Sequence, residues 1–160
     1  MYNPYSLEGK TILITGAASG IGKATSIESS KMGAKIVAVD LNAEGLEKLM
    51  PQLEGEGHLS FAGNLCHEDF LKELGENTPA LDGVFLCAGV SDTTPVKFIT
   101  EEKIQRVFDV NLTAPIMMLK QFRVKKKIKK GGSLVWMSSY GAEKVEPGLG
   151  IYAASKQAVN

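Results

Sequence analysis

The segment TILITGAASGIG, residues 11–22, decides the fold that this sequence predicts. Thr11–Thr15 is apolar or β-branched throughout and predicts a buried strand. Gly16, Gly20 and Gly22 follow, and glycine lets a backbone turn sharply and approach a pyrophosphate closely. A helical pattern begins directly after this turn, and the free N–H groups at the start of a helix favour an anion. We therefore expect a strand–turn–helix unit that binds a dinucleotide, with a tight turn that binds nothing as the alternative.

Strands and helices alternate in the rest of the chain. Further strands are predicted at Lys35–Asp40, Leu59–Ala62, 84–87 and 133–137. Helices are predicted at 21–32, 43–53, 67–76 and in a long segment that Thr100 caps. Most of these strands are apolar on both faces, which is typical of strands that helices cover on both sides. The alternation predicts one α/β domain over residues 1–160, built on a doubly wound parallel sheet.

The composition is that of an ordinary globular chain, with 44% hydrophobic and 22% charged residues. The 18 basic and 18 acidic side chains balance, so no long-range field attracts nucleic acid or an anionic membrane. The sequence has neither a secretory N-terminal pattern nor an apolar run of membrane-spanning length. Cys66 and Cys87 lie in or beside apolar stretches, which favours reduced thiols over a disulfide framework. We expect a soluble cytoplasmic protein.

Two further features are assigned no function. The basic stretch RVKKKIKK, residues 123–130, is interpreted as the solvated C-terminal end of the long helix, where cations complement the helix dipole. His58 and His67 lack the spacing to cysteines, histidines or carboxylates that a metal site needs. We expect neither a nucleic-acid partner nor a bound metal.

Asp40 ends the second predicted strand. An acidic side chain there accepts hydrogen bonds from both hydroxyls of an adenine ribose and repels the 2′-phosphate of NADP. Neither arginine nor lysine occurs at Ala17, Ala18 or Ser19 to receive that phosphate. These residues favour NAD over NADP. A turn or N-cap role for Asp40 is the alternative, because a helix begins a few residues later, and the two roles are compatible.

Tyr152 and Lys156 are four residues apart, which places them on one face of a helix. A free phenol has a pKa of about 10, too high for a base at neutral pH. An ammonium roughly 4 Å away contributes about 4 kcal/mol at an effective dielectric near 20, and half of that lowers the pKa by more than one unit. Such a pair occurs by chance in many helices, so its meaning depends on the other motifs.

Taken together, residues 15–22, Asp40, Asn111, the Ser138–Ser139 pair and the Tyr152/Lys156 pair resemble the short-chain dehydrogenase/reductase superfamily over essentially the whole chain. The resemblance implies a Rossmann fold with strand order 3-2-1-4-5, incomplete at its C-terminal edge.

The resemblance also implies catalytic roles for matching residues. Tyr152 is implied as the general acid/base, and Lys156 as the lysine that lowers its pKa and binds the nicotinamide ribose. Ser139 is implied as the hydrogen-bond partner of the reacting oxygen, and Asn111 as part of a proton relay through water. Ser138 is a neighbouring candidate, with capping of the strand end as its alternative role.

The residues that contact the cofactor follow from the same resemblance. They are Gly16, Ala18, Ser19, Gly20, Ile21, Gly22, Asp40, Leu41, Asn64, Leu65, Cys87, Ala88 and Gly89, together with Tyr152 and Lys156. Two positions depart from the family pattern. Leu86-Cys87 replaces a pair of asparagines that ties neighbouring strands, and Asn64 replaces a common aspartate that contacts adenine.

Pro115 adds an argument about Asn111 that is independent of the family. Proline has no N–H, so the carbonyl four residues earlier, that of Asn111, receives no helical hydrogen bond from it. We expect this carbonyl to be available to a relay water. A proline tolerated at a kink for packing reasons is the alternative.

These residues predict an NAD-dependent oxidoreductase that interconverts a secondary alcohol and a ketone, with Tyr152 as acid/base. Family members continue beyond the helix of Tyr152. We therefore expect that residues 1–160 are either part of a longer chain or a truncated product. A small-molecule substrate and assembly into dimers or tetramers are implied for the full chain. The alternative is a catalytically inactive fragment that binds a dinucleotide or a partner.

Overall fold

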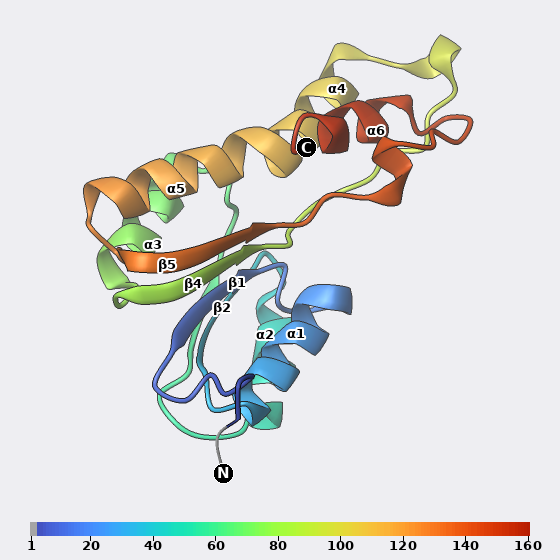
Figure 1. The fold of residues 1–160 in the computed structure, drawn as a ribbon. Helices are drawn as coiled ribbons and strands as arrows, with labels where there is room; N and C mark the ends of the chain where they lie inside the picture. Colours follow the sequence, from blue (N-terminus) through green and yellow to red (C-terminus); the bar gives the residue numbers. More distant parts are fainter. Residues whose placement is uncertain (1–2) are drawn as a thin grey trace.

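The computed structural model describes residues 3–160, which form a five-stranded sheet (Figure 1). The strands are β1 (Thr11–Thr15), β2 (Lys35–Asp40), β3 (Leu59–Ala62), β4 (Leu81–Leu86) and β5 (Ile128–Trp136). Their order is β3-β2-β1-β4-β5, and every neighbouring pair is parallel. The predicted α/β class and strand order are confirmed.

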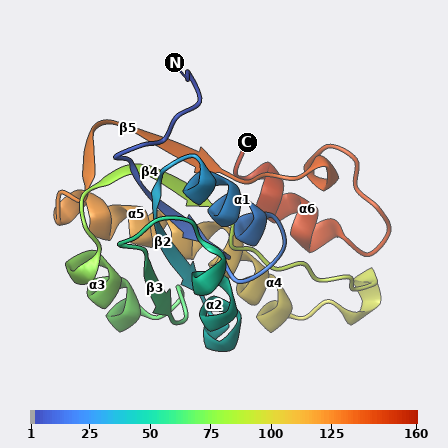
Figure 2. The same ribbon diagram turned by 90° about the horizontal axis from the view of Figure 1, so that it is seen from below.

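Helices cover both faces of this sheet (Figures 1 and 2). One face carries α1 (Gly20–Lys31) and α2 (Ala43–Leu49), and the other carries α3 (Glu68–Asn77) and α5 (Ala114–Val124). The remaining long helices, α4 (Glu101–Phe108) and α6 (Gly150–Gln157), pack against each other. Short helical turns lie at η1 (Met50–Gln52), η2 (Val96–Phe98), η3 (Asp109–Thr113) and η4 (Tyr140–Ala142).

The core has two layers because successive residues of a strand point to opposite faces of a sheet. In β1, Leu13 belongs to the apolar cluster that includes Leu74 of α3 and Phe122 of α5. Its neighbour Ile14 belongs to the other cluster, with Leu46 of α2. All five of these side chains are at most 2% exposed. The first strand is therefore buried on both sides, as its sequence predicts.

Element ends differ from the prediction by three residues or more at three places. Helix α2 stops at Leu49 and passes into η1, because Pro51 cannot donate the next helical hydrogen bond. Strand β4 begins at Leu81 and leaves Cys87 outside. Strand β5 begins at Ile128, five residues earlier than predicted, and its pairing with β4 shifts register between Leu81 and Gly83.

The basic stretch 123–130 is only partly the helix end that we predicted. Helix α5 ends at Val124, and Lys126 adopts a left-handed backbone with φ of 53°. The residues from Ile128 onward pair with β4, so the second half of the stretch lies in a strand. Lys125 contacts Glu76 and Lys129 contacts Asp82, at 3.1 and 2.7 Å. Acidic neighbours thus balance part of this charge.

The long helix after Thr100 is interrupted. Thr100 caps α4 by accepting from the Lys103 N–H, as predicted. Helix α4 then passes through η3, a π-helical turn in which the Ala114 N–H donates to the Asp109 carbonyl, and continues as α5. Pro115 follows at once, and its missing N–H fits this wider turn. The helix is therefore not a continuous α-helix at Asn111.

Strand β5 forms one edge of the sheet. It pairs with β4, and Leu134 and Val135 are 50% and 55% exposed. Within residues 3–160, no helix combines the length and the apolar character needed to cross a membrane.

Candidate active site

A cleft of about 870 Å³ opens at the carboxyl ends of the strands. It is lined by most of the predicted site residues: Gly16, Ser19, Gly20, Ile21, Gly22, Asp40, Leu41, Asn64, Leu65, Cys87, Ala88, Gly89, Ser139, Tyr152 and Lys156. Of the predicted residues, Ala18 and Asn111 are not part of this lining. The loops after the strands and helix α6 thus bring residues together that lie up to 140 positions apart, from Gly16 to Lys156.

The turn between β1 and α1 is shaped by its glycines. Gly16 and Gly20 have φ angles of 69° and 52°, which side chains rarely permit. A Cβ on Gly22 would collide with the carbonyl oxygen of Gly16, so this turn requires glycine at position 22. Ser19 stands at the N-cap of α1 without a capping side-chain hydrogen bond. The first turn of α1 therefore presents uncapped N–H groups beside the cleft.

Asp40 joins the end of β2 to this turn. One carboxylate oxygen accepts from the Ala18 N–H and the other from the Asn42 N–H, each at 2.9 Å. Ala18 therefore contributes its backbone to the position of Asp40 and does not line the cleft. Asn42, not Asp40, is the N-cap of α2. Asp40 therefore has the turn role rather than the N-cap role, and it also lines the cleft.

Thr15 ties the ends of β1 and β4 together. Its hydroxyl oxygen accepts from the N–H groups of Cys87 and Ala88, at 3.0 and 3.1 Å. Thr15 is 1% exposed. This side chain supplies a link between neighbouring strand ends where the sequence lacks the family's asparagine pair.

Asn64 and the two cysteines, Cys66 and Cys87, line the cleft. The Asn64 side chain accepts from the Cys66 N–H at 2.9 Å and contacts the ring of His67. Its amide is thus engaged within its own turn. Burial raises the pKa of the thiols of both Cys66 and Cys87, and in Cys87 the ammonium of Lys156 acts in the opposite direction.

Lys156 places an ammonium in the floor of the cleft. The residue is 3% exposed, and Nζ donates to the Met137 carbonyl at 2.9 Å. Burial lowers the pKa of this lysine from its ordinary value. A Cβ added to Gly89 would lie 3.3 Å from Nζ and 3.2 Å from Oδ1 of Asn111, so Gly89 leaves room for the lysine head.

Asn111 lies behind the cleft and is fully buried. Its Oδ1 accepts from the Val90 N–H at 2.8 Å, and its Nδ2 donates to the Val90 carbonyl at 2.9 Å. Nδ2 also donates to Oγ of Ser155 at 2.9 Å, and Ser155 in turn donates to the Tyr152 carbonyl at 2.7 Å. The side chain of Asn111 therefore connects the loop after β4 to the helix of Tyr152.

The two serines after β5 have different partners. Ser138 donates its hydroxyl to the Lys156 carbonyl at 3.3 Å, which fixes the strand end to α6. Ser139 accepts from the Gly141 N–H at 3.1 Å and caps η4, so its own O–H stays available as a donor. A Cβ on Gly141 would lie 3.4 Å from Oγ of Ser139 and 3.7 Å from the ring of Tyr152, which shows how near these two side chains are.

The lining also contains residues that the sequence did not single out as site members: Gly63, Cys66, Val90, Ser91, Val110, Met137 and Tyr140. Most are chain neighbours of predicted residues, and this adjacency was the available signal. The residues present fit a nicotinamide dinucleotide, since an uncapped helix start and a glycine turn meet a carboxylate and an ammonium in one cleft. Over residues 3–160, no group of three His, Cys, Asp or Glu side chains is arranged to hold a metal ion.

The chain matches the family model described as short chain dehydrogenase over residues 10–160. It therefore belongs to the short-chain dehydrogenase family.

Relatives of known name support this assignment. The 3-oxoacyl-[acyl-carrier-protein] reductase FabG of Thermotoga maritima is 36% identical over 160 residues, which cover 96% of this chain and 65% of that protein. D-threitol dehydrogenase of Mycolicibacterium smegmatis is 32% identical, over 95% of this chain and 61% of that protein. An uncharacterized oxidoreductase of Listeria monocytogenes is 31% identical, over 96% and 64%. The chain thus spans less than two thirds of the length of these relatives.

Solved structures agree with the fold. A short chain dehydrogenase of Shigella flexneri, complexed with NADP, superposes with a TM-score of 0.88 at 28% identity, over 98% of this chain and 70% of that one. One of Escherichia coli CFT073, complexed with NADPH, gives 0.86 at 29%, over 99% and 70%. These proteins hold the phosphorylated cofactor, which gives no support to the predicted preference for NAD.

Proposed function

We propose that this chain carries the cofactor site and the acid/base residue of an oxidoreductase that interconverts a secondary alcohol and a ketone. One observation supports this most strongly: Ser139, Tyr152 and Lys156 line the same cleft as the uncapped start of α1. An enzyme of this class has to hold a dinucleotide and a proton donor within reach of one substrate carbon. The whole protein's activity and substrate are part of this proposal.

Tyr152, Ser139 and Lys156 have separate roles in this reaction. In oxidation, Tyr152 takes the hydroxyl proton of the alcohol while a hydride leaves the same carbon, and the C–O bond becomes a carbonyl; reduction reverses both transfers. Ser139 has its O–H available to hold the reacting oxygen. Lys156 supplies the buried positive charge of the cleft. A bound nicotinamide supplies the hydride chemistry.

We further propose NAD as the preferred cofactor. Asp40 lines the cleft at the adenosine end, where its charge opposes a 2′-phosphate. Among the cleft-lining residues of the described chain, Lys156 is the cation, and it lies at the other end with Tyr152. The NADP-bound relatives make a direct comparison of the two cofactors necessary. We expect a lower KM for NAD than for NADP, and a lower KM for NADP would refute this preference.

The function is tested by Tyr152→Phe in the full-length protein, with NADH absorbance and a panel of secondary alcohols. We expect a loss of about 10³-fold in kcat, because one acid/base group contributes 10²- to 10⁴-fold, and unchanged dinucleotide binding. Tyr5→Phe is the matched control, since Tyr5 is 76% exposed and lies outside the cleft. Equal activity of Tyr152→Phe and the unaltered protein would refute the acid/base role.

A second candidate is an inactive protein that binds a dinucleotide without turnover. The uncapped start of α1 and the glycine turn before it favour this candidate, because they suit a dinucleotide whether or not a substrate reacts. Binding of NADH without reaction of any alcohol would support this candidate. We also propose that residues 1–160 form a single cofactor-binding domain and that the full protein is a cytoplasmic homo-oligomer, which size-exclusion chromatography with light scattering and cell fractionation test.

A further inference from the structure

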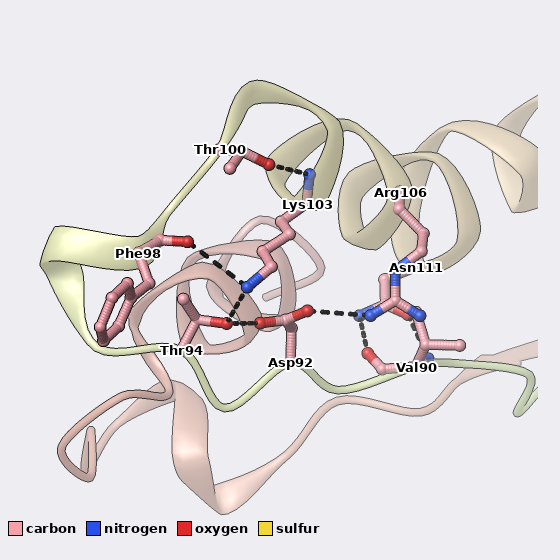
Figure 3. Close-up of polar contacts among 8 residues, drawn as sticks. All are labelled: Val90, Asp92, Thr94, Phe98, Thr100, Lys103, Arg106 and Asn111. Atoms are coloured by element: carbon pink, nitrogen blue, oxygen red, sulfur yellow. Dashed lines mark hydrogen bonds and ion pairs between the residues drawn. The ribbon is translucent and has the colours of Figure 1, made fainter.

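The loop between β4 and α4 contains a polar cluster that neither the sequence motifs nor the proposed chemistry uses (Figure 3). Asp92 lies at its centre with a side chain that is 10% exposed. One carboxylate oxygen accepts from Nη2 of Arg106 in α4 at 2.9 Å, and the other accepts from the Thr94 hydroxyl. Lys103, also in α4, donates to that hydroxyl oxygen at 3.1 Å. The loop is thus fastened to α4 by charged groups.

The same loop holds the start of the helix that carries Tyr152. The Thr94 N–H donates to the Gly148 carbonyl at 2.9 Å, two residues before α6 begins at Gly150. Helix α6 has no side-chain cap at its N-terminus, and Thr94 is 5% exposed. A short helix without a cap depends on outside contacts to fix its first turn. The backbone link from Thr94 to Gly148 is such a contact.

The far end of the loop is attached to the same helix by a separate route. Val90 is bonded on both its N–H and its carbonyl by Asn111, which reaches α6 through Ser155. Asp92 therefore lies between the two loop residues that are linked to α6, Val90 and Thr94, and its neighbour Ser91 lines the cleft. The position of the loop and the position of Tyr152 are set together.

We propose that Asp92, through Arg106 and Thr94, is a positioning residue for the first turn of α6 and hence for Tyr152. The proposal rests on the proposed function for its kinetic consequence. Misplacement of a catalytic group by about 1 Å costs up to about 10²-fold in rate. Loss of the carboxylate charge is expected to lower kcat without weakening dinucleotide binding, because the turn from Gly16 to Gly22 takes no part in the cluster.

The test compares Asp92→Asn with Asp82→Asn in the full-length protein. Asp82 is a matched control, since its side chain is 18% exposed and accepts from Lys129 and from the Thr11 N–H at the opposite end of the strands. We expect Asp92→Asn to lower kcat about tenfold, to leave the Kd for NADH within twofold, and to speed amide hydrogen exchange over residues 148–154. Asp82→Asn is expected to change none of these by more than twofold.

Arg106 offers a second pair of variants that keep the carboxylate. Arg106→Lys retains a cation for Asp92 and is expected to retain most of kcat, whereas Arg106→Met is expected to lower kcat in the same direction as Asp92→Asn. This pair decides the matter if Asp92→Asn fails to fold, since Arg106 is 55% exposed. The proposal is overturned if Asp92→Asn leaves kcat and exchange unchanged, if Asp82→Asn causes an equal loss, or if the loss lies in the Kd for NADH.

These outcomes are distinct from failure of the proposed function. Absence of turnover in the unaltered protein, with no effect of Tyr152→Phe, contradicts the proposed function. Hydrogen exchange over residues 148–154 then still decides whether Asp92 anchors the start of α6, because that measurement needs no substrate.

Discussion

The two ends of the cleft are built on opposite principles. At the α1 end, the turn from Gly16 to Gly22 requires residues without a side chain, because a Cβ on Gly22 would collide with the Gly16 carbonyl. At the α6 end, Asn111, Ser138 and Lys156 depend on polar atoms that are present, each bonded to a backbone group of another element. The first end therefore resists added volume, and the second resists the removal of hydrogen-bonding groups.

Under the proposed function, this difference lets one cleft meet two needs. A pyrophosphate needs bare backbone N–H groups at close range, which only small residues provide. A proton-transfer site needs side chains held in one orientation, and hydrogen bonds to backbone atoms do so without blocking the reacting groups. Substitutions at the two ends should consequently fail in different ways.

The largest effect is expected for Asn111→Leu, which tests the α6 end. The change keeps the volume but leaves the N–H and carbonyl of Val90 and the Ser155 hydroxyl without their partner. Each buried polar group left unpaired costs about 1 to 3 kcal/mol, so we expect a loss of about 4 kcal/mol in the free energy of unfolding. Urea denaturation measures this.

Asn77→Leu is the control for that substitution. Asn77 is exposed, and its amide donates only to the Glu73 carbonyl one helical turn away. A change below about 0.5 kcal/mol is expected, as for surface positions in general. Similar losses for both asparagines would mean that the α6 end does not depend on buried polar links.

A smaller effect is expected for Gly22→Ala, which tests the α1 end. The added methyl group would meet the Gly16 carbonyl and force the turn to move, at a cost of about 1 to 3 kcal/mol. NADH binding, measured by fluorescence titration, should be lost. Gly20→Ala is the control: its Cβ would meet nothing within 4 Å, so only the backbone strain of about 1 kcal/mol remains. Equal stability losses would contradict the steric argument.

The smallest effect concerns pH and the buried charge of Lys156. Burial lowers its pKa in the folded protein below the ordinary value of 10.5, so the unfolded chain holds this proton more tightly. At neutral pH the buried charge of Lys156 therefore lowers the free energy of unfolding. This loss disappears as the pH rises through the folded pKa toward 10.5, because the lysine then becomes neutral in the folded protein. The unfolding free energy of the unaltered protein, minus that of Lys156→Met, should therefore increase with pH. A flat difference between pH 7 and 11 would show that the ammonium is well solvated.

The sequence predicts the α1 end better than the α6 end, for a physical reason. Strand β1 and the turn after it are local: their apolar run and glycines are contiguous, and the structure has β1 and β2 at the predicted bounds. The start of β5 was missed because Ile128 pairs with Leu81, far along the chain, and the pairing bends through Gly131–Gly132. Long-range pairing leaves no local pattern.

Side-chain partners at the site were also beyond sequence reasoning. The motif indicated Asn111 and Ser139, and Pro115 indicated an irregular helix, which the structure has as η3. Neither pattern shows that the amide of Asn111 holds Val90 and Ser155, or that Asp92 meets Arg106. Such partners come from separate elements, and their contacts depend on tertiary packing.

Gly89 has a consequence for any redesign of this cleft. Because even a methyl group there would sit 3.3 Å from Nζ of Lys156, enlarging this position forces the lysine head, which donates to the Met137 carbonyl, to shift. Lys156→Arg would crowd the same contact with Gly89, since a guanidinium is broader than an ammonium. Attempts to admit bulkier ligands have more freedom at Ser91, which is exposed and borders the same opening.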